Sequence, residues 1–190
     1  GLSTSTRNVI KKIFPHSLPK NMDSEVLARL MFCLENHPER ENGHVSGAQD
    51  AIGICVPGLC RHYYDNRFWP DKIETCNEES ILTWLEDHLC MIPMFPRRKG
   101  CSVVENTNVT KENVLALTSA ADDCWEAIME QNLEKFASSF RASFEAQISM
   151  FPGMINPKED ADALRGNDGF LDSVQDYIKK KKKKTGVLAW

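Results

Sequence analysis

The chain has 190 residues, of which 42% are hydrophobic and 26% are charged, and its formal net charge is −4. These values are ordinary for a globular protein with a sizeable core. The acidic balance argues against general binding of nucleic acids, and the sequence holds no apolar run of about 18 residues that would predict a membrane span.

The cysteines favour a reduced, cytoplasmic protein. There are seven of them, their spacings are scattered, and no C-x-x-C pair occurs. The nearby histidines and cysteines do not form a compact zinc pattern, so we expect no metal centre from His37, His44, Cys55, Cys60 and His62. The sequon at Asn108 is interpreted as a helix start in a cytoplasmic chain.

The first third of the chain is predicted to be mainly helical. Ser3 to Phe14 carries an apolar stripe at helical spacing and ends before two prolines, and Ser24 to Leu34 forms a second, well-capped helix. A polar loop from Asn36 to Gly47 leads to a short apolar run, Ala51 to Val56, which stops at a Pro-Gly pair. The following stretch from Tyr63 is rich in aromatic residues and reads first as a loop and then as a short strand.

The rest of the chain combines helices with short strands, which predicts an α+β fold. One or two helical turns precede a buried strand at Leu89 to Phe95, and long helices are expected from Thr110 to Glu130 and from Leu133 to Pro152. The second of these has a stripe that we assign to the core: Leu133, Phe136, Phe140, Phe144 and Ile148. A short helix at 160–165, a last helix at 170–178 and a strand starting at 187 complete the prediction.

Two short segments are candidates for chemistry. The opening stretch GLSTSTRNVIKKI places hydroxyl side chains at the start of a helix, where unpaired backbone N–H groups and the helix dipole favour a phosphate. A plain serine N-cap explains the same pattern. In SGAQDAIGI, Asp50 lies among small residues in a predicted Gly-rich turn, where it could deprotonate a substrate hydroxyl or simply belong to the turn.

The lysine run at 179–184 is interpreted as the solvated end of a helix, because cations suit the C-terminal end of the helix dipole and no aromatic residues interleave with them. A specific anion site is the alternative interpretation.

The two candidate segments, taken together and in this order, resemble two motifs of the GHMP kinases. Gly1-Leu2-Ser3-Thr4-Ser5-Thr6 resembles the second signature of that family, G-L-x-S-S-A. The stretch from Gly47 to Gly53 resembles the G-x-Q-D-x-x-G motif of its sugar kinases, notably the heptose-phosphate kinase and fucokinase branch, with galactokinase in the same superfamily. The resemblance extends over essentially the whole chain.

This resemblance implies an ATP- and Mg²⁺-dependent kinase that phosphorylates a hydroxyl of a sugar or sugar phosphate, with the anomeric hydroxyl as one candidate acceptor. Gly1 to Thr6 would bind the nucleotide phosphates, Ser5 would contact Mg²⁺, and Asp50 would be the catalytic base. Arg97 or Arg98 could reach a substrate phosphate, but a solvated turn is the favoured interpretation of these residues.

The chain departs from the family pattern at three positions. Thr4 and Thr6 replace the usual Ser and Ala of the signature, and Ala51 stands where many sugar kinases have Gln. Thr4 keeps a hydroxyl, whereas Thr6 adds bulk where a small residue is usual.

The resemblance also implies a domain organisation. Residues 1–65 would be the remainder of an N-terminal kinase domain with the phosphate-binding helix and the catalytic Asp loop. Residues 66–190 would be a truncated, ferredoxin-like C-terminal domain. We therefore expect an internal fragment, inactive alone, of a kinase roughly twice this size. The alternatives are a non-catalytic sugar- or nucleotide-binding member of the family and a helical interaction domain without a ligand.

Overall fold

The structure is a computed structural model that describes residues 2–13, 22–37, 45–91, 107–151 and 180. The chain divides into two compact units, Gly1–Thr83 and Trp84–Trp190. The boundary predicted between residues 65 and 66 falls within the connection of a β-hairpin, and the expected division into two kinase domains stays a prediction.

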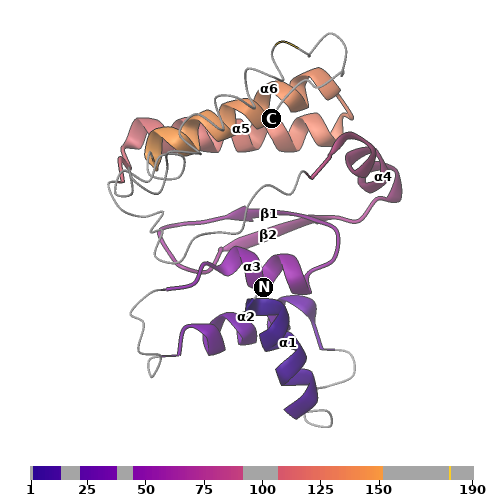
Figure 1. Cartoon of the computed structure of the whole chain (residues 1–190), viewed down its shortest axis with the longest axis vertical. Coiled ribbons are helices and arrows are strands. Elements are labelled where there is room, and N and C mark those ends of the chain that lie inside the picture. Colours follow the sequence, from indigo (N-terminus) through magenta and orange to yellow (C-terminus); the bar gives the residue numbers. More distant parts are fainter. Residues whose placement is uncertain (1, 14–21, 38–44, 92–106, 152–179, 181–190) are drawn as a thin grey trace. The chain divides into compact units, whose positions relative to one another are not determined.

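Three helices form the first part of unit 1 (Figure 1): α1 spans Leu2–Ile13, α2 spans Ser24–Glu35 and α3 spans Ala48–Cys55. The helix predictions for the first two segments are confirmed. Helix α2 begins where the sequence provides a cap, because an Asp23 side-chain oxygen accepts hydrogen bonds from the backbone N–H groups of Glu25 at 2.7 Å and Val26 at 3.3 Å.

A β-hairpin follows α3, which confirms the predicted short strand and adds a second one. Strands β1 (Leu59–Tyr63) and β2 (Lys72–Cys76) pair antiparallel, with Leu59 opposite Cys76 and Tyr63 opposite Lys72. Alternate residues of a strand point to opposite faces. Cys60 and Ile73 accordingly share one face, and both pack against a buried cluster of α2 and α3 formed by Ala28, Ala48 and Ile52.

Gly58 makes the turn from α3 into β1. Its φ of +82° lies in the left-handed region that side chains disfavour. A Cβ atom at this position would also collide with the backbone oxygen of Cys76 and the side chain of Asn77. Both the backbone conformation and the available space therefore require glycine here.

Helix α4 (Glu79–His88) confirms the helical turns predicted after the hairpin, and it crosses the boundary between the two units. The buried strand predicted from Leu89 to Phe95 is wrong over its first three residues. Leu89, Cys90 and Met91 have no regular structure and are exposed, with 95% of Met91 accessible. The rest of that predicted strand lies outside the described residues.

Helices α5 (Lys111–Met129) and α6 (Leu133–Met150) confirm the two long helices predicted for this region. They lie side by side in unit 2 (Figure 1). Both begin at a capping side chain: Thr110 Oγ1 accepts from Asn113 N at 3.2 Å, and Asn132 Oδ1 accepts from Lys135 N at 3.1 Å. The start of α5 is tied to the end of α6 by a hydrogen bond from Asn108 N to the carbonyl oxygen of Met150, at 2.8 Å.

The core of this helix pair is built mostly from small side chains. Ala120 and Ala127 of α5 and Ala137 and Ala146 of α6 are buried, which lets the two backbones approach closely. The aromatic stripe predicted for α6 forms the core only in part. Phe136 is buried, but Phe140 is 42% exposed.

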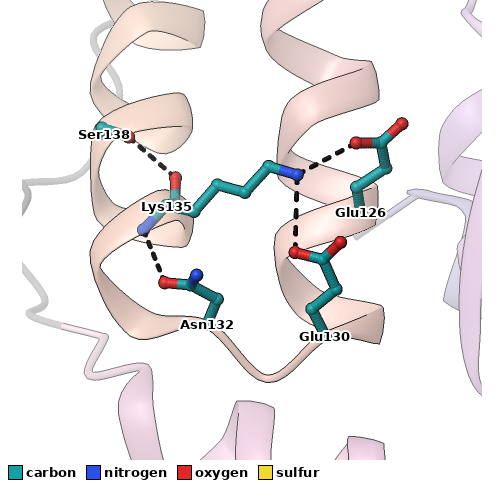
Figure 2. Close-up of polar contacts among 5 residues, drawn as sticks. All are labelled: Glu126, Glu130, Asn132, Lys135 and Ser138. Atoms are coloured by element: carbon teal, nitrogen blue, oxygen red, sulfur yellow. Dashed lines mark hydrogen bonds and ion pairs between the residues drawn. The ribbon is translucent and has the colours of Figure 1, made fainter.

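A single lysine links the two helices beside their connecting turn (Figure 2). Lys135 Nζ of α6 binds Glu126 Oε2 at 3.0 Å and Glu130 Oε2 at 3.5 Å, both on or next to the last turn of α5. These contacts raise the pKa of Lys135, chiefly through its hydrogen bond to Glu126. Because both carboxylates are well exposed, the ion pairs orient the turn more than they stabilise it.

The coarse fold class is confirmed, since the described residues combine helices with a two-stranded antiparallel sheet. The kinase-like arrangement within that class stays a prediction. Several expected features lie outside the described residues: the turn with Arg97 and Arg98, the helices at 160–165 and 170–178, the lysine run apart from Lys180, and the strand starting at 187.

The Gly58 turn gives a first prediction. Gly58→Ala should lower the free energy of unfolding by about 2 kcal/mol, because it adds backbone strain and a steric collision. Gly53→Ala is the matched control. Gly53 lies within α3 with no atom within 4 Å of its Cβ position, so this change should stabilise the chain by about 0.5 to 1 kcal/mol. Urea denaturation measures the change in stability of both variants. Equal effects of the two substitutions would contradict the requirement for glycine at position 58.

The cap of α6 gives a second prediction. Asn132→Ala should destabilise the chain by about 1 kcal/mol, because the backbone N–H of Lys135 loses its acceptor. Thermal unfolding followed by circular dichroism would measure the change. Thr107→Ala, at another exposed polar residue outside the helices, should have a much smaller effect, and a comparable loss there would argue against the cap.

Candidate functional site

The predicted phosphate-binding segment lies on α1. Ser5 is exposed in the first half of the helix, whose first turn contains no acidic residue and whose last turn contains Lys11 and Lys12. An N-terminal turn without carboxylates leaves the positive end of the helix dipole uncompensated. The described structure does not include Gly1. It also does not include the side chains of the other four predicted phosphate-binding residues, which are Leu2, Ser3, Thr4 and Thr6.

The sequence suggested that Asp50 lies in a loop, but the structure places it in the first turn of α3. The glycines that suggested a turn have other roles: Gly47 is the N-cap of the helix and Gly53 lies on its exposed side. Asp50 is itself exposed. A carboxylate in the first turn of a helix interacts favourably with the positive end of the helix dipole.

Asn36 fixes the start of α3. Its Nδ2 group donates to the carbonyl oxygen of Phe32 at 2.9 Å and to that of Ser46 at 3.2 Å, while its Oδ1 accepts from Ser46 N at 2.7 Å. The end of α2 is thereby joined to the residue just before Gly47. In the sequence, Asn36 is predicted only to start a polar loop, because nothing local indicates a partner ten residues away.

Helices α1 and α3 carry the two motif segments and share one buried cluster. Ile10 of α1, Met31 of α2 and Ala51 of α3 form it, each at most 3% exposed. The Cys55 thiol extends this contact by donating to Met31 Sδ at 3.2 Å. Ala51 follows Asp50 directly, so its burial fixes the backbone next to the carboxylate. Its small size also matches the space there, and a longer polar side chain would have to displace Ile10 or Met31.

The connection between β1 and β2 is anchored to the same helices by Trp69. The indole packs against the Ala28, Ala48 and Ile52 cluster, and its ring centroid lies 5.6 Å from that of Phe32. The Arg29 guanidinium lies 5.0 Å from the same indole ring centroid. This connection was expected to be an aromatic loop, but its anchoring on α2 and α3 was not foreseen.

A cluster of charged and aromatic side chains occupies one face of the hairpin. Tyr63 donates its hydroxyl to Glu74 Oε2 at 2.7 Å, and Arg61 and Lys72 lie 4.8 and 4.9 Å from its ring centroid. The hydrogen bond from Tyr63 is the main cause that holds the pKa of Glu74 below its usual range, with Lys72 and Arg61 adding to it. The Glu74 carboxylate is therefore held in place by its contacts within the hairpin.

Three alternate residues of the segment starting in β1 are partly buried and titratable. Burial raises the pKa of Cys60 and of Tyr64 and lowers that of His62. The Nε2 atom of His62 is buried without a hydrogen-bond partner within the described structure. A neutral imidazole suits such a position, since a charged ring would be desolvated.

Among the described residues, neither metal ligands nor a cavity brings the candidate residues together. Within the described ranges, no group of three or more His, Cys, Asp or Glu side chains could hold a metal ion. A groove of about 550 Å³ runs along α2, and Ser5 and Asp50 are not among its described lining residues, which are Asp23, Glu25, Val26, Arg29, Leu30 and Cys33. No described helix combines the length and apolarity needed to cross a membrane.

Comparisons with models of protein families, with curated proteins and with solved structures find no match to this chain. The resemblance to kinases therefore rests on the two motif segments alone. In the structure, the helices that contain these segments, α1 and α3, pack together in unit 1.

The Tyr63–Glu74 contact gives a third prediction. Because the pKa of Glu74 is lower in the folded chain than in the unfolded one, the ionised carboxylate stabilises the hairpin at neutral pH, and this contribution is lost as the pH falls through the folded-state pKa. Tyr63→Phe should raise that pKa towards its unfolded-state value, so the stabilising contribution should be smaller and its loss should be complete at a higher pH.

An NMR titration of the Glu74 side-chain carboxyl would measure the shift. Tyr64→Phe removes a hydroxyl from the neighbouring position and serves as the control, because Tyr64 is not among the groups that perturb Glu74. An unchanged Glu74 titration in Tyr63→Phe would show that the hydroxyl does not control this carboxylate.

Proposed function

We propose that this chain carries the phosphate-binding helix and catalytic base of an ATP-dependent sugar kinase of GHMP type. The observation that carries the proposal is the shared packing of α1 and α3. The two motif segments are far apart in the sequence, but Ile10 of α1 and Ala51 of α3 belong to one buried cluster. This is the arrangement that a joint role of the two motifs requires.

Asp50 has the accessibility that a catalytic base needs. It is exposed, it lies in the first turn of α3, and the residue after it is fixed in the core. A base must reach the substrate hydroxyl and be held in place when the proton is transferred. Asp50 would accept the proton of the sugar hydroxyl while that oxygen attacks the γ-phosphorus of ATP, and ADP would leave as the bond from the γ-phosphorus to the bridging oxygen breaks.

Helix α1 would bind the phosphates of the nucleotide. Backbone N–H groups at a helix N-terminus point outward and carry partial positive charge, and no carboxylate in the first turn of α1 competes for them. The proposed contacts are the segment from Gly1 to Thr6, with the Ser5 hydroxyl directed to the ion–phosphate group. Positioning and charge stabilisation of this kind provide most of the rate enhancement in phosphoryl transfer.

The described residues are compatible with Mg²⁺ brought in by the nucleotide. Mg²⁺ is commonly bound through a few protein oxygens together with phosphates and water, so the lack of a described acidic cluster does not conflict with it. Ser5 offers one exposed hydroxyl oxygen of the right chemistry. When bound, the ion would neutralise charge on the phosphates.

Asp50→Asn gives the test of this function, made in the full-length kinase that the resemblance implies. It should lower the turnover of ATP-dependent sugar phosphorylation by about a hundredfold to ten-thousandfold, because the amide cannot accept the proton. ATP binding, measured by calorimetry, should persist. Asp123→Asn, an exposed aspartate of α5, is the matched control and should leave turnover unchanged.

Full activity in Asp50→Asn would remove Asp50 from the role of base. Binding of ATP or sugars without any turnover in the unmodified protein would instead identify a non-catalytic member, which is the alternative function. Absence of both ligand binding and turnover would favour the remaining alternative, a helical interaction domain without a ligand.

A further inference from the structure

The β1–β2 connection presents an exposed aromatic ring on an anchored loop. Phe68 is 70% exposed and Tyr64 is 48% exposed, whereas Pro70 is buried. Single exposed apolar side chains are common on protein surfaces. This ring, however, stands next to a residue packed on α2 and α3, so its open face is held where a ligand can reach it.

Contacts at both ends of the loop hold its backbone in place. Asp71 N donates to the carbonyl oxygen of Tyr63 at 2.8 Å, and Arg67 forms an ion pair with Asp71 at 3.2 Å. Trp69, next to Phe68, is packed on α2 and α3. The ring of Phe68 is thus attached to a backbone that loses little further freedom when a ligand binds, which favours affinity.

The anchor point connects the loop to the helix of Asp50. Trp69 packs against the cluster that contains Ala48, and Ala48 is the first residue of α3. Asp50 belongs to the same helical turn as Ala48. A ligand that rests on this loop is therefore bound by the same rigid body that positions the proposed base.

The charges of the loop favour a neutral ligand. Residues 64–71 contain two acidic side chains and one basic side chain, and the basic one, Arg67, is paired with Asp71, so the loop has no basic group outside an ion pair. A phosphate or a nucleic acid would find no excess of positive charge here. A sugar ring fits this chemistry, because its C–H face can lie on an aromatic ring while its hydroxyls bind planar polar side chains such as those of Asp65, Asn66 and Arg67.

We propose that Phe68 and its neighbours in the β1–β2 loop form a platform for the sugar ring of the acceptor. This inference rests on the proposed kinase function, and it assigns the specificity for the acceptor to a loop outside both motif segments. Phe68 would contact the apolar face of the sugar, and the Asn66–Arg67 edge would bind its hydroxyls.

Saturation-transfer NMR on the full chain tests the platform with L-fucose, D-galactose and D-mannose as probes. Saturation should reach the ring C–H protons of at least one sugar. Phe68→Ala should weaken that binding about tenfold, and Phe68→Tyr should retain it because the aromatic face is kept. Folding should be preserved in both variants, since Phe68 is mostly exposed.

Phe140→Ala, at another exposed phenylalanine in unit 2, is the matched control and should not change sugar binding. The platform is refuted if none of the three sugars binds, or if Phe68→Ala binds as tightly as the unmodified chain. These outcomes are separate from those for Asp50. Turnover that depends on Asp50 but not on Phe68 refutes only the platform, and Phe68-dependent sugar binding without turnover refutes only the kinase.

Discussion

Unit 1 depends on the close packing of small side chains between α2 and α3. Ala28, Ala48 and Ile52 are essentially inaccessible to solvent, and the hairpin packs onto this cluster through Cys60, Trp69 and Ile73. A larger side chain at either alanine would separate the helices and displace the indole. The placement of Asp50 and of the aromatic loop therefore follows from one contact between two helices.

The sequence predicted the elements that local physics controls. Helix α5 could be predicted because Thr110 is a recognisable cap and its apolar residues recur at helical spacing. Helix α3 was missed because two glycines within a short segment suggested a turn, whereas burial of Ala48, Ala51 and Ile52 against α1, α2 and the hairpin outweighs the low helix propensity of Gly53. Tertiary packing therefore determines that this segment forms a helix.

The sequence could predict which residues belong to the candidate site, but not which other residues hold them in place. Asp50 and Ser5 were found from motif resemblance, and both are accessible, as their predicted roles require. The groups that support the proposed site were not predictable in the same way. Asn36 and Trp69 act through partners distant in the sequence, and a single sequence carries no signal for such pairs.

The hydrogen bonds of Asn36 have a consequence for how this region can vary. They bring Ser46 next to the end of α2, so the two ends of the segment between them are held together independently of what that segment contains. The entropic cost of closing a loop grows only slowly with its length. Changes in the length of the connection between α2 and α3 are therefore expected to leave the start of α3, and Asp50 with it, in place.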